Sequence, residues 1–264
     1  MPTVSIGDAD IYYEEKGQGP PLMLVPGLAG TGAFFISQVP EFSRDFRTIV
    51  HDHRGAGRSS FSRIRYSVEQ MADDTLRLMD ALGVDTAHFV GHSTGGAIGQ
   101  VIATDHPERL RSLVLSATWA GPDPYFRRLF ESRKQTLLDS GVEAYLKASS
   151  LVQATPRWVS ENDEFITELH RVTAASYPPV EIVVSRIDAI LRHDRRSRLL
   201  QIRVPTLVIV ARDDMITPSF YSEELASAIP GAKLIVLDGG GHFAPAIHAT
   251  PYNAAVGAFL RALR

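Results

Sequence analysis

Short apolar runs rich in β-branched residues recur along the chain and alternate with amphipathic stretches. The runs are typical of buried strands and cover Leu22 to Val25, Arg47 to Val50, Ala87 to Val90, Ser112 to Ser116, Thr206 to Val210 and Lys233 to Leu237. A helical pattern such as Ser67 to Leu82, with Gly83 as a stop signal, separates several of them. This alternation predicts an α/β fold with a mostly parallel, doubly wound sheet.

The alternation fails between about Gly121 and Arg203. Helical patterns follow one another there without a convincing strand, until Val204 and Pro205 precede the next one. The chain has 264 residues, of which 44% are hydrophobic, which is enough to bury one sizeable core. We therefore expect residues 1–120 and 204–264 to form the α/β core and residues 121–203 to form a helical cap inserted into it.

Composition narrows the classes of partner. A formal net charge of -3 gives no overall field that would attract nucleic acid or an anionic membrane, so the expected partner is a small-molecule substrate. The N-terminal residues show no basic segment followed by an apolar one, which favours a soluble cytoplasmic protein. Because the chain has no cysteine, disulfides, cysteine-bound zinc and a thiol nucleophile are excluded. Any nucleophile must be an oxygen or a nitrogen.

One serine stands in a pattern suited to nucleophilic attack. Ser93 lies in Val90-Gly91-His92-Ser93-Thr94-Gly95, directly after a predicted strand and before a small-residue run that favours a helix. A sharp strand-to-helix turn that exposes a serine needs small residues on both sides, and Gly91 and Gly95 supply them. The pattern alone is weak, but this context favours a nucleophile over a simple turn.

A serine hydroxyl needs a histidine base, which in turn needs a carboxylate to orient it. His242 follows the last predicted strand in a run of three glycines, whereas His248 looks surface-facing and is a distant second. Asp214 lies in the turn after the strand Thr206 to Val210, and its neighbour Asp213 stays open as an alternative. The predicted catalytic residues are thus Ser93, Asp214 and His242.

An acyl-transfer site also needs hydrogen-bond donors for the developing oxyanion, each worth about 3 to 4 kcal/mol when removed. The glycine-rich loop at residues 25–32 follows the first predicted buried strand and lacks the spacing of a phosphate-binding loop. We expect the backbone N–H groups of Leu28 and Thr94 to form the oxyanion hole.

Other patterns have simpler explanations. His51 and His53 resemble a metal pair, but no third ligand stands nearby, and we expect neither a metal nor an organic cofactor. The arginine-rich stretch at residues 192–198 is most simply a solvated surface. The residues expected to contact substrate are Gly27, Trp119, Tyr125, Phe126 and Trp158, and an acidic substrate held by an arginine of the insert is a second possibility.

The arrangement resembles the α/β-hydrolase family over almost the whole chain. The resemblance rests on four motifs in order, namely Asp52-His53-Arg54-Gly55-Ala56-Gly57-Arg58-Ser59, the Ser93 turn, Asp214 to Pro218, and Gly241-His242. Within the family the chain is similar to β-ketoadipate enol-lactonases, aminoacrylate hydrolases and small carboxylesterases, some of which dimerise through the insert. The family often has His-Gly where this chain has Pro26-Gly27, which removes a side-chain hydrogen bond but leaves the backbone donors.

These features predict a serine hydrolase that cleaves a small ester, lactone or activated amide or carbamate through an acyl-enzyme. The resemblance leaves two alternatives open. One is a cofactor-free oxygenase or haloperoxidase-like enzyme, against which Leu28 counts, because those enzymes usually carry an aromatic residue there. The other is a non-catalytic ligand-binding protein of the same fold.

Overall fold

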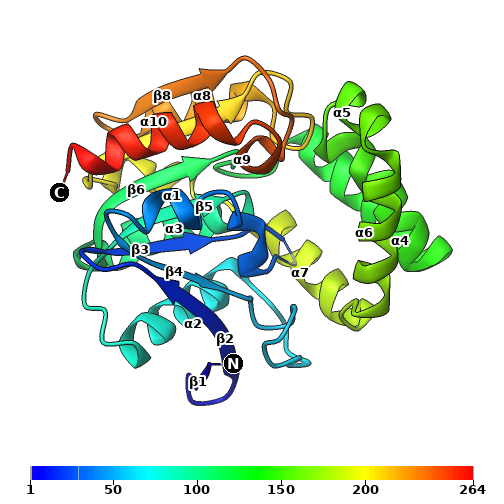
Figure 1. Cartoon of the computed structure of the whole chain (residues 1–264), viewed down its shortest axis with the longest axis horizontal. Coiled ribbons are helices and arrows are strands. Elements are labelled where there is room, and N and C mark those ends of the chain that lie inside the picture. Colours follow the sequence, from blue (N-terminus) through cyan, green and yellow to red (C-terminus); the bar gives the residue numbers. More distant parts are fainter. Residues whose placement is uncertain (1, 29, 264) are drawn as a thin grey trace.

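A computed structural model describes residues 2–28 and 30–263, so Met1, Ala29 and Arg264 lie outside the description. The strands form one sheet in the order β1-β2-β4-β3-β5-β6-β7-β8 (Figure 1). They are β1 (Thr3–Ser5), β2 (Asp10–Lys16), β3 (Pro21–Val25), β4 (Arg47–His51), β5 (Ala87–His92), β6 (Leu110–Ser116), β7 (Thr206–Ala211) and β8 (Lys233–Leu237). Neighbours from β4 to β8 pair in parallel, which confirms the predicted α/β class with a mostly parallel sheet.

Two strands were not predicted from the sequence. β1 pairs antiparallel with β2, and β2 pairs antiparallel with β4 at the edge of the sheet. Residues 14–16 of β2 are charged and solvent-exposed, so this strand lacks the continuous apolar run by which the buried parallel strands are recognised.

The side chains of the central strands alternate between two cores, as the two-residue repeat of a strand requires. In β3, Met23 and Val25 join the core that also contains residues of α2 (Val68–Ala81), α3 (Thr94–Asp105) and α8 (Ser219–Ala228). Leu22 and Leu24 join the opposite core, with residues of α1 (Val39–Phe42) and α10 (Ala249–Arg261). The sheet is therefore covered by helices on both faces.

The regular elements between β6 and β7 are all helices. These are α4 (Pro124–Gln153), α5 (Pro156–Glu161), α6 (Asp163–Ala175), α7 (Val180–Arg192) and the short η3 (Arg196–Gln201). Figure 1 shows α4, α5 and α6 gathered beyond the end of the sheet at which β3 and β6 terminate. The long element α4 consists of two helical segments joined across a kink at Gly141, whose φ is 80° and ψ is -175°. Among the described helices, none is both long and apolar enough to cross a membrane.

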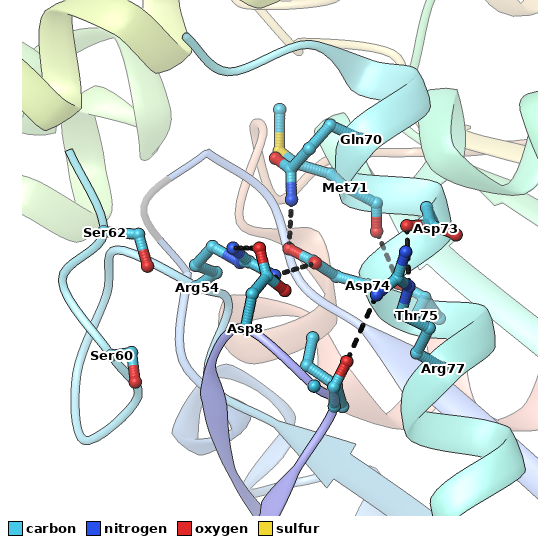
Figure 2. A network of polar contacts seen from close by, with 12 residues as sticks. Asp8, Arg54, Ser60, Ser62, Gln70, Met71, Asp73, Asp74, Thr75 and Arg77 are labelled. Atoms are coloured by element: carbon cyan, nitrogen blue, oxygen red, sulfur yellow. Dashed lines mark hydrogen bonds and ion pairs between the residues drawn. The ribbon is translucent and has the colours of Figure 1, made fainter. Parts of the chain in front are cut away.

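A buried arginine fixes the loop that follows β4 (Figure 2). The Arg54 guanidinium donates to both oxygens of Asp8 and to Oδ1 of Asp74, the last at 2.7 Å. Gln70 donates to the other oxygen of Asp74. These contacts tie the loop to α2 and to the segment before β2, and they secure the adjacent residues Asp52 and His53, which reach the candidate site.

Candidate active site

Ser93 lies at a sharp turn between β5 and α3. Its backbone has a φ of 54° and a ψ of -116°, a conformation that L residues rarely adopt. A Cβ added at Gly91 would come within 2.2 Å of the Gly95 carbonyl oxygen, and one at Gly95 within 2.1 Å of the Val25 carbonyl oxygen. Ser93 N–H also donates to the Ser116 carbonyl at 2.8 Å. The two glycines therefore make room for the turn, and the sheet holds it in place.

Asp214 and His242 meet in the loops after β7 and β8. Asp214 Oδ2 lies 2.9 Å from Nδ1 of His242 and accepts the Thr217 hydroxyl at 2.9 Å, while Oδ1 accepts the N–H groups of Ile216 and Thr217. Both side chains are buried. Because a carboxylate only accepts hydrogen bonds, the proton of a neutral His242 ring lies on Nδ1, and the lone pair that a general base requires is then on Nε2.

The two alternative residues lie elsewhere. Asp213 is exposed, and its Oδ1 accepts the N–H of Gly241 at 2.9 Å, so it supports the loop that carries His242 without touching the imidazole. His248 is exposed as well. The structure thus brings Asp214 to His242 and leaves Asp213 in a supporting contact.

The loop after β3 approaches Ser93 closely. A Cβ at Gly27 would lie 3.1 Å from that of Ser93, so a larger residue would crowd the serine. Of the two predicted donors, Leu28 lines the same cavity as Ser93, and Thr94 is the first residue of α3, where a backbone N–H has no intrahelical acceptor. Ala29, which belongs to the predicted loop, lies outside the described residues.

His53 and Asp52 hold the loop after β3 by hydrogen bonds. Nε2 of His53 lies 2.9 Å from the Pro26 carbonyl oxygen, and its backbone N–H donates to the Gly30 carbonyl at 3.3 Å. Asp52 Oδ1 accepts the N–H of Gly32 at 2.9 Å. Burial lowers the pKa of His53 well below its usual value, so the imidazole is neutral and its Nε2–H donates to Pro26. One residue of the suspected metal pair, His53, thus supports the loop.

A cavity of about 570 Å³ contains both Ser93 and His242 in its wall. Most of the remaining wall is apolar and comes from the loop after β3, the loop of His242 and the helices of the insert. It includes Gly27, Leu28, Phe34, Phe130, Trp158, Phe165, Leu169 and Phe243. Of the predicted substrate contacts, Gly27 and Trp158 are therefore at the cavity.

The other three predicted substrate contacts lie away from the cavity wall. Trp119 and Phe126 are fully buried in the core, where their ring centroids are 4.5 Å apart. Tyr125 is exposed and donates its hydroxyl to the Met215 carbonyl. The expectation for these three residues needs correction: α4 turns Phe126 into the protein and Tyr125 toward solvent, and Trp119, in the segment before α4, packs on Phe126.

The structure adds residues that the sequence patterns did not single out for this site. Phe34 stacks on His92 with ring centroids 4.6 Å apart, and the ring of His92 is centred 4.8 Å from that of His242. Burial, and then the neighbouring His242, lowers the pKa of His92 well below its usual value. A neutral ring therefore packs beside His242. The identity of His92 was visible in the sequence, but its packing was not. Within the described part of the chain, no three potential ligands gather in a way that would hold a metal ion.

Comparison with known proteins places the chain in a family. Residues 20–249 match the model of the alpha/beta hydrolase fold family. A protein of Azorhizobium caulinodans named "Putative carbamate hydrolase RutD" is 41% identical over 253 residues, which cover 96% of each chain. A protein of the same name from Caulobacter vibrioides is 38% identical over 269 residues, covering 98% of this chain and 99% of its own.

Solved structures agree with this assignment. The enol-lactonase from Burkholderia xenovorans LB400 superposes with a TM-score of 0.91 at 27% identity, covering 98% of this chain and all (100%) of the enol-lactonase. A bromoperoxidase from Bacillus anthracis superposes with a TM-score of 0.89 at 25% identity, covering 98% of this chain and 99% of its own. The chain therefore belongs to the α/β-hydrolase family and is a hydrolase of that superfamily.

Proposed function

We propose that the chain is a serine hydrolase that cleaves a small ester, lactone or carbamate. The observation that carries this proposal is the joint placement of Ser93 and His242 in the wall of one cavity, with Asp214 bound to the far side of the imidazole. The similarity to proteins named for carbamate hydrolysis and for enol-lactone hydrolysis supports the substrate classes.

In the proposed reaction, Oγ of Ser93 attacks the substrate carbonyl carbon while its proton passes to Nε2 of His242. The N–H groups of Leu28 and Thr94 stabilise the oxyanion of the tetrahedral intermediate. The intermediate collapses, the leaving group takes the proton from Nε2, and the acyl group stays on Ser93. Water then attacks the acyl carbon, again giving a proton to Nε2, and that proton returns to Ser93 as the free acid departs. One water molecule is consumed per bond cleaved.

The solved bromoperoxidase structure motivates a second candidate activity, halide oxidation without a cofactor. Bromination of monochlorodimedone by the purified protein in the presence of peroxide and bromide is the direct assay. Ester turnover far above bromination supports the hydrolase.

The test of the hydrolase is covalent labelling. A fluorophosphonate should modify Ser93 by forming an Oγ–P bond with loss of fluoride, and peptide mass mapping locates the label. We expect His242→Ala to abolish labelling, and we expect Ser93→Ala to lose turnover of p-nitrophenyl butanoate. Full activity in Ser93→Ala would refute the proposal, whereas a folded protein that neither labels nor turns over any ester would indicate a ligand-binding role.

A further inference from the structure

A positively charged side chain of the insert lies in the cavity wall with Ser93 and His242. Arg133, on α4, lines the same cavity of about 570 Å³. Only 9% of its surface is exposed. A guanidinium stays charged under all physiological conditions, and a buried charge is costly unless an opposite charge accompanies it.

The described residues supply no carboxylate within salt-bridge distance of Arg133. Its Nη2 donates to two neutral hydroxyls, those of Tyr145 at 3.0 Å and Ser149 at 3.1 Å, and its Nε has no hydrogen-bond partner. The guanidinium carbon also lies 5.1 Å from the ring centre of Phe130. These contacts orient the guanidinium without neutralising it.

Other buried arginines of the chain either have carboxylate partners or lie away from the cavity. Arg54 pairs with Asp8 and Asp74, and Arg195 pairs with Glu69 and Asp105. Arg186 also has no carboxylate partner among the described residues, but it donates to the backbone carbonyl of Arg54 and does not line the cavity. Arg133 thus combines burial, an uncompensated charge and a position at the cavity.

We propose that Arg133 binds a carboxylate of the substrate, so that the hydrolase acts on small esters, lactones or carbamates that carry a carboxylate besides the carbonyl that is cleaved. A guanidinium presents N–H donors in a planar fork that matches a carboxylate, and the pair gains strength in a site that excludes water. The surrounding apolar wall suits a short carbon chain between the two groups. This inference rests on the proposed hydrolase function and specifies its substrate.

The test compares two esters that differ only in charge, mono-p-nitrophenyl adipate and its terminal carboxamide. The variants are Arg133→Met, Arg133→Lys and, as a matched control, Arg128→Met, which removes an exposed charge from the same helix. We expect the native protein to prefer the carboxylate ester at least tenfold in kcat/KM, mainly through KM. Arg133→Met should lose that preference while hydrolysing the carboxamide within about threefold of the native rate. Arg133→Lys should retain part of the preference, and Arg128→Met all of it.

Equal losses on both esters in Arg133→Met, or no preference in the native protein, would overturn the role of Arg133 and leave the hydrolase intact. Turnover of neither ester would count against the hydrolase. In that case calorimetry still decides the role of Arg133, because it needs no catalysis: butanoate should bind the native protein more tightly than butanamide, and Arg133→Met should erase the difference. Equal binding of the two compounds by the native protein would overturn the inference.

Discussion

Asp214 and His242 are joined by a hydrogen bond of 2.9 Å between Oδ2 and Nδ1. An asparagine at position 214 would fill the same space but present an amide N–H to the imidazole or lose the charge that stabilises its protonated form. We expect Asp214→Asn to lower kcat for p-nitrophenyl butanoate by about 10³ to 10⁴.

Asp213 provides the control for this substitution. Its carboxylate accepts the N–H of Gly241 and does not contact His242. Asp213→Asn keeps an oxygen acceptor, so we expect kcat to stay within about tenfold of the native value. Comparable losses in the two variants would show that the loop, and not the imidazole, is the sensitive element.

Ser93 stores backbone strain that glycine would relieve. Its φ of 54° is unfavourable for a residue with a Cβ. We expect Ser93→Gly to abolish activity and to raise the free energy of unfolding by about 1 kcal/mol, the relief of strain being offset in part by the flexibility of glycine in the unfolded chain. Ser93→Ala keeps the Cβ and therefore the strain, so its free energy of unfolding should rise less than that of Ser93→Gly. Urea unfolding of the native protein, Ser93→Gly and Ser93→Ala measures these free energies. Equal stability of the alanine and glycine variants would contradict the presence of strain at Ser93.

His53 supports the proposed oxyanion hole through the Pro26 carbonyl, 2.9 Å from its Nε2. Leucine at this position would leave that buried carbonyl without its partner and loosen the loop that carries Leu28. We expect His53→Leu to lower kcat by about tenfold or more, because a displaced oxyanion donor costs transition-state stabilisation, with KM little changed.

The matched control is His51→Leu, which removes a buried imidazole two residues away whose Nδ1 has no hydrogen-bond partner. Steady-state kinetics and thermal melting should be measured on both variants. An equal fall of kcat in the two would point to a general loss of packing rather than to the contact with Pro26.

Buried neutral histidines should make the protein sensitive to acid. Burial lowers the pKa of His193 to about 4, whereas a histidine in the unfolded chain has a pKa of about 6.5. Below the unfolded pKa, the histidine of the unfolded state binds a proton, whereas the buried His193 of the folded state stays neutral until the pH approaches its own, lower pKa. Stability is therefore unaffected above pH 6.5, falls by about 1.4 kcal/mol per pH unit between the two pKa values, and levels off below the folded one.

We expect His193→Phe to remove this share of the pH dependence, since phenylalanine can keep the edge contact with Trp119 at a centroid distance near the native 6.0 Å. The free energy of unfolding should fall between pH 7.5 and pH 5 by about 2 kcal/mol less in the variant than in the native protein. His51 and His88, whose pKa values burial also lowers to about 4, keep their own contributions. Identical pH dependence in both proteins would refute the assignment.

The central strands could be predicted because burial on both faces leaves a nearly continuous apolar run, as in β3 and β7. β2 could not, because its exposed half carries charges. The elements that hold Ser93, Asp214 and His242 were likewise visible, since glycines and turn residues follow strands whose carboxyl ends share one edge of a sheet.

Which residues line the cavity was much harder to predict. Trp119 and Phe126 have the composition of a binding surface, but both are buried in the core, Trp119 in the segment between β6 and α4 and Phe126 on the inward face of α4. Arg133 was one of several arginines in the insert, and what distinguishes it is burial without a carboxylate combined with a position in the cavity wall. On α4 a single turn separates Phe126, which is in the core, from Phe130, which lines the cavity. Local sequence patterns do not determine how a long helix is rotated about its axis.

The end of α4 is hydrogen-bonded to the loop that carries His242. Phe243, next to His242, donates its backbone N–H to the carbonyl of Gln153, the last residue of α4, at 3.0 Å. The part of α4 that follows the kink at Gly141 is therefore hydrogen-bonded to the segment that carries the proposed base, His242. A transplant of residues 121–203 from a relative would exchange the anchor of that segment as well as the substrate wall, so we expect such chimaeras to recover full turnover only when the loop from Gly239 to Phe243 is exchanged with it.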